Sequence, residues 1–271
     1  MRVWNVFISV ALALAAVAPG QTPASVPRPG MPTLFVIGDS TANLPTRQGW
    51  GDPFADYFDP GKITVLNRAR GGRSARTFFD EGLWKRVLEE LKPGDYVLIQ
   101  FGHNDGGIQP TGRADLPGTG DETKQSTIPD GKTELVHTFG WYIRRFVQDA
   151  EAKGAHPIVL SITVRDAWRN GKVERGLSGG QFGRWSQEVA EAEGVPFVDV
   201  TNIVADTYEK MGPQRVRPLF TANATHTTPA GADLTASLIV AGLKGIRSPL
   251  VELLSAKGQA VAAAQSMEGT P

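Results

Sequence analysis

Five short apolar runs recur along the chain, each bounded by glycine, proline or polar residues. Runs of this length between turn-forming residues are typical of buried β-strands. We predict strands at Leu34–Ile37, Ile63–Leu66, Asp95–Phe101, Pro157–Ile162 and Pro196–Val200.

Segments with a helical spacing of apolar residues separate these runs. The clearest is Glu81–Leu91, in which apolar residues recur every three or four positions and so share one helical face. Further helices are predicted at Trp50–Phe58, Thr133–Lys153 (with Thr133 as its cap), Gly180–Glu193, Ile203–Met211 and Ala230–Leu243. The segment Asp105–Lys132 is rich in Gly, Pro, Thr and Asp, which predicts a long loop of the kind that is often functional.

The alternation of strands and helices indicates the fold class. Strands and helices at this spacing predict a parallel sheet with helices on both faces. A chain of 271 residues is long enough for one such domain with a sizeable core. No segment has the composition of an interdomain linker, so we predict a single α/β domain in three layers, α/β/α.

The N-terminus has the pattern of a secretory signal peptide. Arg2 precedes the apolar stretch Val3–Val17, and Ala16–Ala18 forms an A-x-A-like cleavage site. A membrane anchor is the alternative, although the stretch is shorter than the ~20 residues of a spanning helix. We predict a secreted or periplasmic protein cut near Ala18, with a disordered lead-in over 19–32, a folded domain over 33–255 and a flexible tail over 256–271.

Charge and cysteine content exclude several classes of function. Lys+Arg and Asp+Glu both number 28, so no overall basic field would attract nucleic acid. The absence of cysteine excludes disulfides, thiolate metal sites and cysteine nucleophiles. Neither an H-E-x-x-H metal motif nor a G-x-x-x-x-G-K phosphate loop occurs. We expect no metal, no cofactor, no nucleic-acid partner, no membrane association after signal cleavage, and a monomer.

Four polar segments follow predicted strands or begin a predicted helix. They are Gly38–Thr41, Gly71–Arg76, Phe101–Asp105 and Thr225–Ala232. Because the strands of a parallel sheet all point the same way, we expect these segments to converge on one edge of the sheet. Ser40, directly after the first strand, would then meet residues from the far end of the chain.

These segments contain the residue types that acyl transfer needs. Ser40 is a candidate nucleophile, and His226 is the candidate base because its ordinary pKa near 6.5 lets it accept and return a proton. The oxyanion of a tetrahedral intermediate needs preorganised donors. Candidates are the backbone N–H of Gly72, the side-chain amide of Asn104 and the backbone N–H of Ser40.

In sequence motif and order, the four segments resemble the blocks of the SGNH, or GDSL-type, hydrolases, which are named for Ser, Gly, Asn and His. The matches are G-D-S at Ser40, the glycine before Arg-Ser-Ala-Arg at Gly72, G-x-N-D from Gly102 to Asp105, and the late His226. Within that family, G-R-S-A-R, F-G-H-N-D and T-H-T-x-x-x-G-A are most similar to the rhamnogalacturonan acetylesterase branch.

This resemblance covers roughly residues 33–243 and implies both a fold and an activity. It implies a flavodoxin-like parallel five-stranded sheet (the SGNH hydrolase fold). It also implies a serine esterase that removes O-acetyl groups from pectin-type (rhamnogalacturonan) or related plant polysaccharides through an acyl-enzyme on Ser40. The expected partner is therefore an acetylated polysaccharide or oligosaccharide.

One position departs from the family pattern. The family's triad acid is an Asp three residues before the His, and here that position is Asn223. An amide can orient the imidazole but cannot supply the charge that stabilises its protonated form. Three hypotheses follow: a Ser–His pair with Asn223 as the orienting member of the catalytic set, another carboxylate beside His226, or a weakly active or inactive relative.

Several other residues are candidates for substrate contacts, each with a structural alternative. Arg73 and Arg76 match uronic acid carboxylates in two-point contacts or, equally, form structural ion pairs. Arg165 and Trp168 follow the fourth strand and so face the same edge, with packing as the alternative for the Trp. His103 is expected to be structural or to face the substrate.

Two rival functions come from other classes. A lipid or thioester hydrolase would share the scaffold, although the polar segment 105–132 suits a sugar better than an acyl chain. A non-catalytic polysaccharide-binding relative would be compatible with Asn223.

Overall fold

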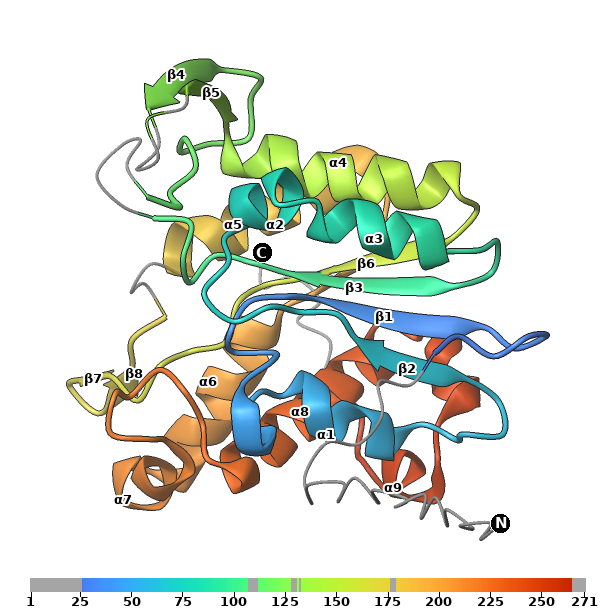
Figure 1. The fold of residues 1–271 in the computed structure, drawn as a ribbon. Helices are drawn as coiled ribbons and strands as arrows, with labels where there is room; N and C mark the ends of the chain where they lie inside the picture. The colour runs from blue at the N-terminus through green and yellow to red at the C-terminus, as the bar shows by residue number, and fades with distance from the viewer. Residues whose placement is uncertain (1–25, 107–111, 128–130, 132, 176–178, 265–271) are drawn as a thin grey trace, which may run out of the picture.

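The computed structural model describes residues 26–106, 112–127, 131, 133–175 and 179–264. Its centre is a five-stranded sheet in the order β2-β1-β3-β6-β9, in which every neighbouring pair is parallel (Figure 1). The strands are β1 (Thr33–Gly38), β2 (Thr64–Asn67), β3 (Tyr96–Gln100), β6 (His156–Leu160) and β9 (Phe197–Val198). The five predicted strands are confirmed, with ends that differ by a few residues.

Helices cover both faces of the sheet and create two separate apolar cores. One face carries α2 (Ala75–Asp80), α3 (Leu83–Glu90), α4 (Phe139–Ala152) and α5 (Gly179–Glu193). The other carries α1 (Gly51–Phe54), α6 (Val200–Met211) and α8 (Pro229–Gly245). Side chains of β1 alternate between the two cores: Phe35 and Ile37 pack on the first, and Leu34 and Val36 on the second. The predicted three-layer α/β fold is therefore confirmed.

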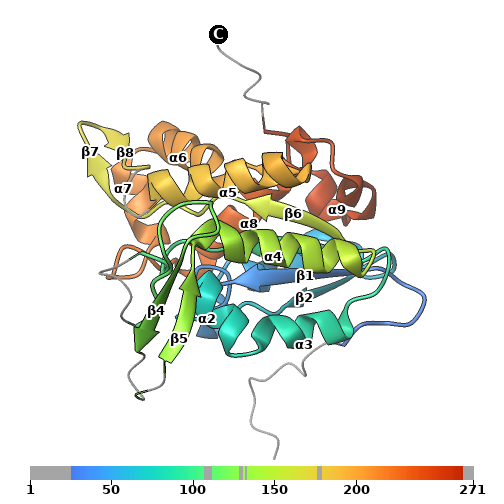
Figure 2. The ribbon, with the colours of Figure 1, turned by 90° about the horizontal axis from the view of Figure 1, so that it is seen from above.

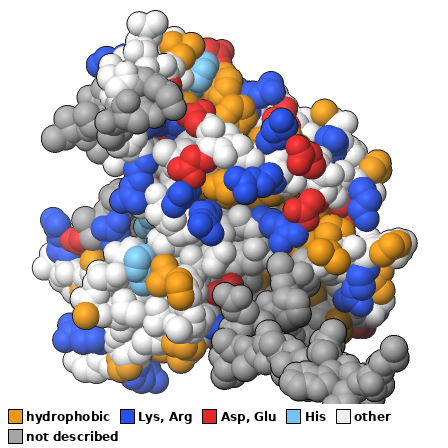
Figure 3. All heavy atoms as spheres, in the orientation of Figure 1, with side chains coloured by type: hydrophobic (Ala, Val, Ile, Leu, Met, Phe, Trp, Pro, Cys, Tyr) orange, Lys and Arg blue, Asp and Glu red, His pale blue; other side chains and the backbone are white. Residues whose placement is uncertain are grey.

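Short elements complete the described chain. The 3-10 turns are η1 (Pro45–Arg47), η2 (Ala55–Tyr57), η3 (Arg217–Leu219) and η4 (Pro249–Leu253), and the remaining helices are α7 (Pro213–Val216) and α9 (Ala256–Gln259). Two antiparallel hairpins, β4 (Thr123–Thr127) with β5 (Thr133–His137) and β7 (Trp168–Arg169) with β8 (Lys172–Val173), lie at the same end of the sheet (Figure 2). On the face drawn in Figure 3, hydrophobic side chains are scattered among charged ones.

The predicted helix over 133–153 is wrong in its first part. Thr133 lies in β5, and α4 begins at Phe139, directly after Thr138, whose side chain accepts a hydrogen bond from the Trp141 backbone N–H. The segment 133–137 instead pairs with β4, whose polar residues were predicted to be loop. Thr138 is the better cap because its hydroxyl reaches the orphan N–H groups of the helix that packs on the sheet.

Predictions at the two ends of the chain fall partly outside the described residues. The proposed signal peptide, residues 1–18, lies wholly outside them, as does the first half of the lead-in, residues 19–25. The predicted tail starts with α9, where Gly258 is buried against the backbone of Tyr57, so its first residues pack on the domain. Within the described ranges, no helix combines the length and apolar character needed to cross a membrane.

Gly102 follows β3 and brings the third polar segment close to the helix layer. Its φ of +140° is rarely adopted by other residues. A Cβ at this position would lie 2.6 Å from Cγ2 of Ile162 and 2.9 Å from Cβ of Phe182, both buried. The backbone beside Asn104 therefore approaches α5 more closely than any residue other than glycine allows.

We predict that Gly102→Ala destabilises the fold by about 2–4 kcal/mol, because overpacking adds to backbone strain. Gly171→Ala is the matched control: its φ is +75° and no atom lies within 4 Å of the added Cβ. The control is expected to lose only about 1–2 kcal/mol. Urea unfolding of both variants measures the difference, and equal losses would contradict close packing at Gly102.

Candidate active site

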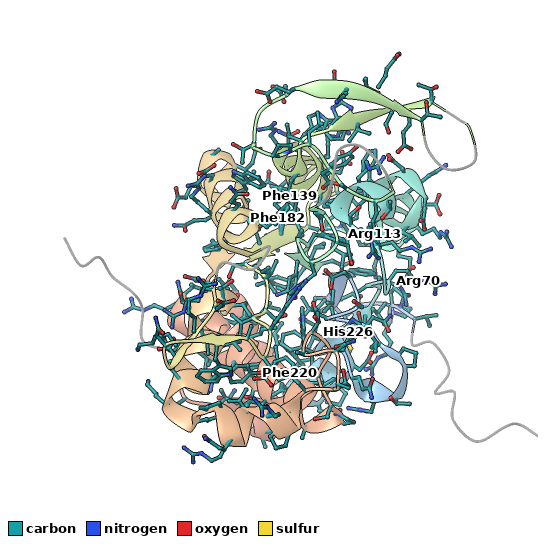
Figure 4. The ribbon with its side chains drawn as sticks, turned by 90° about the vertical axis from the view of Figure 1, so that its left-hand side faces the viewer. Arg70, Arg113, Phe139, Phe182, Phe220 and His226 are labelled. Carbon is teal, nitrogen blue, oxygen red and sulfur yellow. The ribbon has the colours of Figure 1, made fainter. Side chains whose placement is uncertain are left out.

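The four polar segments meet at the carboxyl edge of the sheet. Ser40 follows β1, Gly72 follows β2 and Asn104 follows β3, and these three strands are neighbours. His226 comes from the turn before α8, on the side of the molecule that faces the viewer in Figure 4. The predicted convergence is confirmed for Ser40 and His226, since Ser40 Oγ lies 2.9 Å from His226 Nε2.

Asp39 shapes the turn that presents Ser40. Its Oδ1 accepts hydrogen bonds of 2.8 Å from both the backbone N–H and the hydroxyl of Thr41. This is the loop-fixing role predicted for Asp39. The Ser40 side chain is thereby held at the end of a strand that is fully buried, with only 9 % of its own surface exposed.

Three hydrogen bonds fix the turn that carries His226. The His226 carbonyl accepts from the Thr221 backbone N–H at 2.8 Å, and the Ala224 carbonyl accepts from the Asp166 N–H at 2.9 Å. The Thr227 hydroxyl donates to the Gln48 carbonyl at 2.6 Å, which ties the turn to the loop after Ser40. Ala224 has a left-handed φ of 56°, a strained conformation that is common in functional turns.

The side chain of Asn223 has an orientation that the backbone dictates. Its Oδ1 accepts from the backbone N–H of Thr225 at 3.0 Å and of His226 at 2.9 Å, and from the Thr221 hydroxyl at 3.1 Å. Backbone N–H groups only donate, so the oxygen must face them. The Asn223 amide nitrogen is left facing His226 Nδ1, at 2.7 Å.

This orientation decides the tautomer of the neutral imidazole. An amide N–H that faces Nδ1 donates to it, so Nδ1 is unprotonated and the ring proton lies on Nε2. Nε2–H then donates to Ser40 Oγ. A general base must offer Ser40 a lone pair, so the resting hydrogen bonds run opposite to what base catalysis needs.

Other charges act on His226 from further away. Burial lowers the pKa of His226, the Asp39 carboxylate raises it, and the Arg165 guanidinium lowers it. Of the three hypotheses for Asn223, a second carboxylate hydrogen-bonded to the ring is not found among the described residues. Nor do those residues include a cluster of three His, Asp or Glu side chains that could hold a metal ion.

Three candidate donors at this edge of the sheet, the backbone N–H groups of Ser40 and Gly72 and the side-chain amide of Asn104, have hydrogens left to donate. In the described part of the chain, neither the Ser40 nor the Gly72 backbone N–H has a protein acceptor. Asn104 Nδ2 donates one hydrogen to the Arg73 carbonyl at 3.0 Å and has a second to offer. Gly72 has a φ of +78°, which explains the glycine at this position. This arrangement suits an oxyanion.

Comparison with known proteins agrees with this arrangement. The model of the GDSL-like lipase/acylhydrolase family matches residues 36–234, which contain Ser40, Gly72, Asn104 and His226. The chain belongs to this family. Its relatives include a rhamnogalacturonan acetylesterase of Emericella nidulans, 36 % identical over 206 residues (75 % of this chain, 81 % of the relative). Rhamnogalacturonan acetylesterase RhgT of Bacillus subtilis is 30 % identical over 247 residues (83 % and 96 %).

A solved structure supports the same assignment. The Bacillus subtilis protein YxiM superposes with a TM-score of 0.66 at 26 % identity, over 81 % of this chain and 58 % of that one. The chain thus spans a little over half the length of this structural neighbour. Together, family and relatives identify the chain as a GDSL-like esterase.

In the esterase, Arg73 and Arg76 both pair with acidic side chains. Both therefore form the structural ion pairs that were the alternative to substrate contacts. Arg73 Nε lies 2.9 Å from Glu81, and the fully buried Arg76 pairs with Glu134. A substrate contact of Arg73 therefore stays a prediction.

His103 and Trp168 are also held by the fold of the esterase. The buried His103 contacts the Thr163 hydroxyl through Nε2 at 3.1 Å. Trp168 donates from Nε1 to Asp166 at 2.8 Å while its ring packs on the second core. Their proposed substrate contacts remain predictions.

Sequence reasoning missed one element of the esterase site, a pair of buried carboxyl groups. Asp105 accepts from the Ala75 N–H at 2.7 Å and the Gly102 N–H at 2.9 Å, as its loop-fixing role predicted. Asp115 hydrogen-bonds to Asp105, and both are almost fully buried. Burial raises the pKa of both acids, so the pair keeps a proton. A single Asp in an aperiodic segment gives no signal of such a partner.

We predict that this pair makes the esterase less stable as pH rises. The folded pair holds a proton that the unfolded chain releases above about pH 4, so unfolding becomes easier toward neutral pH. In the Asp115→Asn variant the amide can donate to Asp105 without that proton. The free energy of unfolding of this variant should therefore fall by roughly 2 kcal/mol less than that of the unmodified chain between pH 5 and pH 8.

Urea unfolding at the two pH values tests this prediction. Asp121→Asn removes the same charge from an exposed ion pair with Arg144 and serves as control. Its pH dependence should follow that of the unmodified chain. If the stability of the Asp115→Asn variant depends on pH as that of the unmodified chain does, the two acids do not share a buried proton.

Proposed function

We propose that this esterase removes O-acetyl groups from rhamnogalacturonan-type pectin, using Ser40 as nucleophile and His226 as base. The observation that carries the proposal is the 2.9 Å contact between Ser40 Oγ and His226 Nε2. Candidate oxyanion donors follow β1, β2 and β3 at the same edge of the sheet. The names of two relatives, both rhamnogalacturonan acetylesterases, support the substrate class.

The reaction has two balanced steps. Ser40 Oγ attacks the acetyl carbonyl carbon as its proton passes to His226 Nε2, and the oxyanion is held by Ser40 N–H, Gly72 N–H and Asn104. Collapse expels the sugar oxygen, which takes the proton from Nε2 and leaves acetyl-Ser40. Water then attacks this ester with the same ring as base, releases acetate and restores the serine.

Asn223 makes the first step slow. Before Nε2 can accept a proton, the ring must carry its own proton on Nδ1, where it faces the amide NH2 instead of an acceptor. Turning the amide over would leave two backbone N–H groups without their oxygen. An Asp in this place would keep those bonds with one oxygen and accept from Nδ1–H with the other.

Three further proposals concern the location of the protein, its oligomeric state and a second candidate function. The N-terminal pattern supports secretion with cleavage near Ala18. We also propose that the mature chain is a monomer. The second candidate function is a polysaccharide-binding relative with little turnover. It is favoured by one observation, the amide orientation of Asn223.

Ser40→Ala is predicted to abolish acetate release from acetylated rhamnogalacturonan fragments, because among the described residues only the Ser40 hydroxyl hydrogen-bonds to His226 Nε2. Released acetate is measured directly, and the urea midpoint checks that the fold is intact. Turnover retained at more than a few per cent of the unmodified rate would overturn the nucleophile assignment. Binding without any turnover by the unmodified chain would favour the second candidate function.

Asn223→Asp is predicted to raise kcat on 4-nitrophenyl acetate by about 10²–10⁴-fold. The reverse change in a serine protease lowers kcat about 10⁴-fold. Asn170→Asp, an exposed Asn in the β7–β8 turn, adds the same charge away from the site and should change nothing. If kcat stays within twofold of the unmodified chain, the tautomer of His226 does not limit the rate.

A further inference from the structure

Arg165 lies between two groups that are fastened to the site. Two residues before it, the Thr163 hydroxyl contacts His103 at 3.1 Å. One residue after it, the Asp166 N–H donates to the Ala224 carbonyl in the turn that carries His226. The backbone of Arg165 is therefore fixed beside that turn, in the segment that follows the carboxyl end of β6.

Within the described ranges, the guanidinium of Arg165 has no anionic partner. Its Nε is buried and makes no hydrogen bond, and no described carboxylate pairs with it. Nearby arginines differ: Arg73 pairs with Glu81, and Arg217 lies 3.7 Å from Asp166. A half-buried guanidinium normally acquires a hydrogen-bonded anion, because desolvation without one is unfavourable.

Two more cations lie on the same side of the molecule as His226. Figure 4 labels Arg70 and Arg113 there. Arg113 donates to the Gly72 carbonyl at 3.0 Å, and neither residue pairs with a carboxylate in the described ranges. The rim beside the nucleophile is therefore positive, which suits an anionic ligand.

Arg165 also acts on the catalytic ring. Its positive charge lowers the pKa of His226 and of His103. The same charge disfavours the imidazolium that forms when Ser40 loses its proton. With Asn223 in place of a carboxylate, His226 has no charged hydrogen-bond partner that would offset this effect.

We propose that Arg165 binds the carboxylate of a uronic acid residue in the substrate, and that this carboxylate supplies part of the negative charge that Asn223 lacks. The guanidinium fork matches a carboxylate in two parallel hydrogen bonds. Once bound, the carboxylate neutralises Arg165, so a charged substrate favours its own deacetylation in kcat as well as in KM. The inference rests on the proposed function and adds to it the residue that selects the substrate.

The experiment compares two O-acetylated rhamnogalacturonan oligosaccharides, one with free uronic acid carboxylates and one with methyl-esterified carboxyl groups. The unmodified chain should prefer the free acid by about tenfold or more in kcat/KM, with part of the preference in kcat. Arg165→Gln should remove this preference and raise turnover of neutral 4-nitrophenyl acetate, because an unpaired cation beside His226 is gone. Arg165→Lys should restore only part of the preference.

A control and a binding measurement separate this inference from the proposed function. Arg217→Gln removes a neighbouring exposed cation and should leave the preference unchanged. Calorimetry with the Ser40→Ala chain should show about tenfold weaker binding of the free-acid oligomer after Arg165→Gln, and no change for the methyl ester. Absence of turnover with this binding pattern intact would overturn the esterase proposal alone.

Equal use of both oligomers by the unmodified chain, or an Arg165→Gln chain with an undiminished preference, would overturn the role of Arg165 alone. In an Asn223→Asp background the kcat part of the preference should shrink, because the ring then has its own carboxylate. A merely structural Arg165 would change the urea midpoint without moving the ratio between the two substrates.

Discussion

The hydrogen bond between Ser40 and His226 joins residues 186 positions apart, and the rest of the fold serves to keep its length at 2.9 Å. Ser40 is placed by β1, a strand buried on both faces, and His226 by a turn that the Asp166 backbone and the Gln48 carbonyl hold in place. Neither end can move without breaking backbone hydrogen bonds. Proton transfer between the two groups requires such rigidity, since reactivity falls steeply with misplacement by an ångström.

Within this rigid frame, shape and charge are set separately. The turn from Asn223 to His226 depends on an oxygen that accepts backbone N–H groups, and an amide or a carboxylate provides that oxygen equally well. Only the second atom of the side chain differs, and it determines on which ring nitrogen the proton resides. The site thus has the geometry that the proposed Ser–His mechanism requires, while its resting hydrogen bonds oppose proton transfer to His226.

Much of the fold and of the site could be predicted from the sequence, for identifiable reasons. Apolar runs marked the strands, and glycine-bounded polar segments marked Ser40, Gly72, Asn104 and His226. The start of α4 was misplaced because Thr133 and Thr138 both have cap-like residue types, and only pairing with β4 distinguishes them. The Asp105–Asp115 pair and the pairing of Arg73 with Glu81 depend on how irregular segments fold back, which leaves no periodic pattern in the sequence.

The orientation of Asn223 has a consequence for the ancestry of such chains. Codons for asparagine and aspartate differ by a single nucleotide, and the backbone donors of this turn accept either residue without rearrangement. A lineage can therefore pass between a charged and an uncharged partner for His226 in one mutational step, with no intermediate that fails to fold. The fold requires only a side-chain oxygen at position 223. Asparagine and aspartate therefore differ in their effect on turnover and not in their effect on folding.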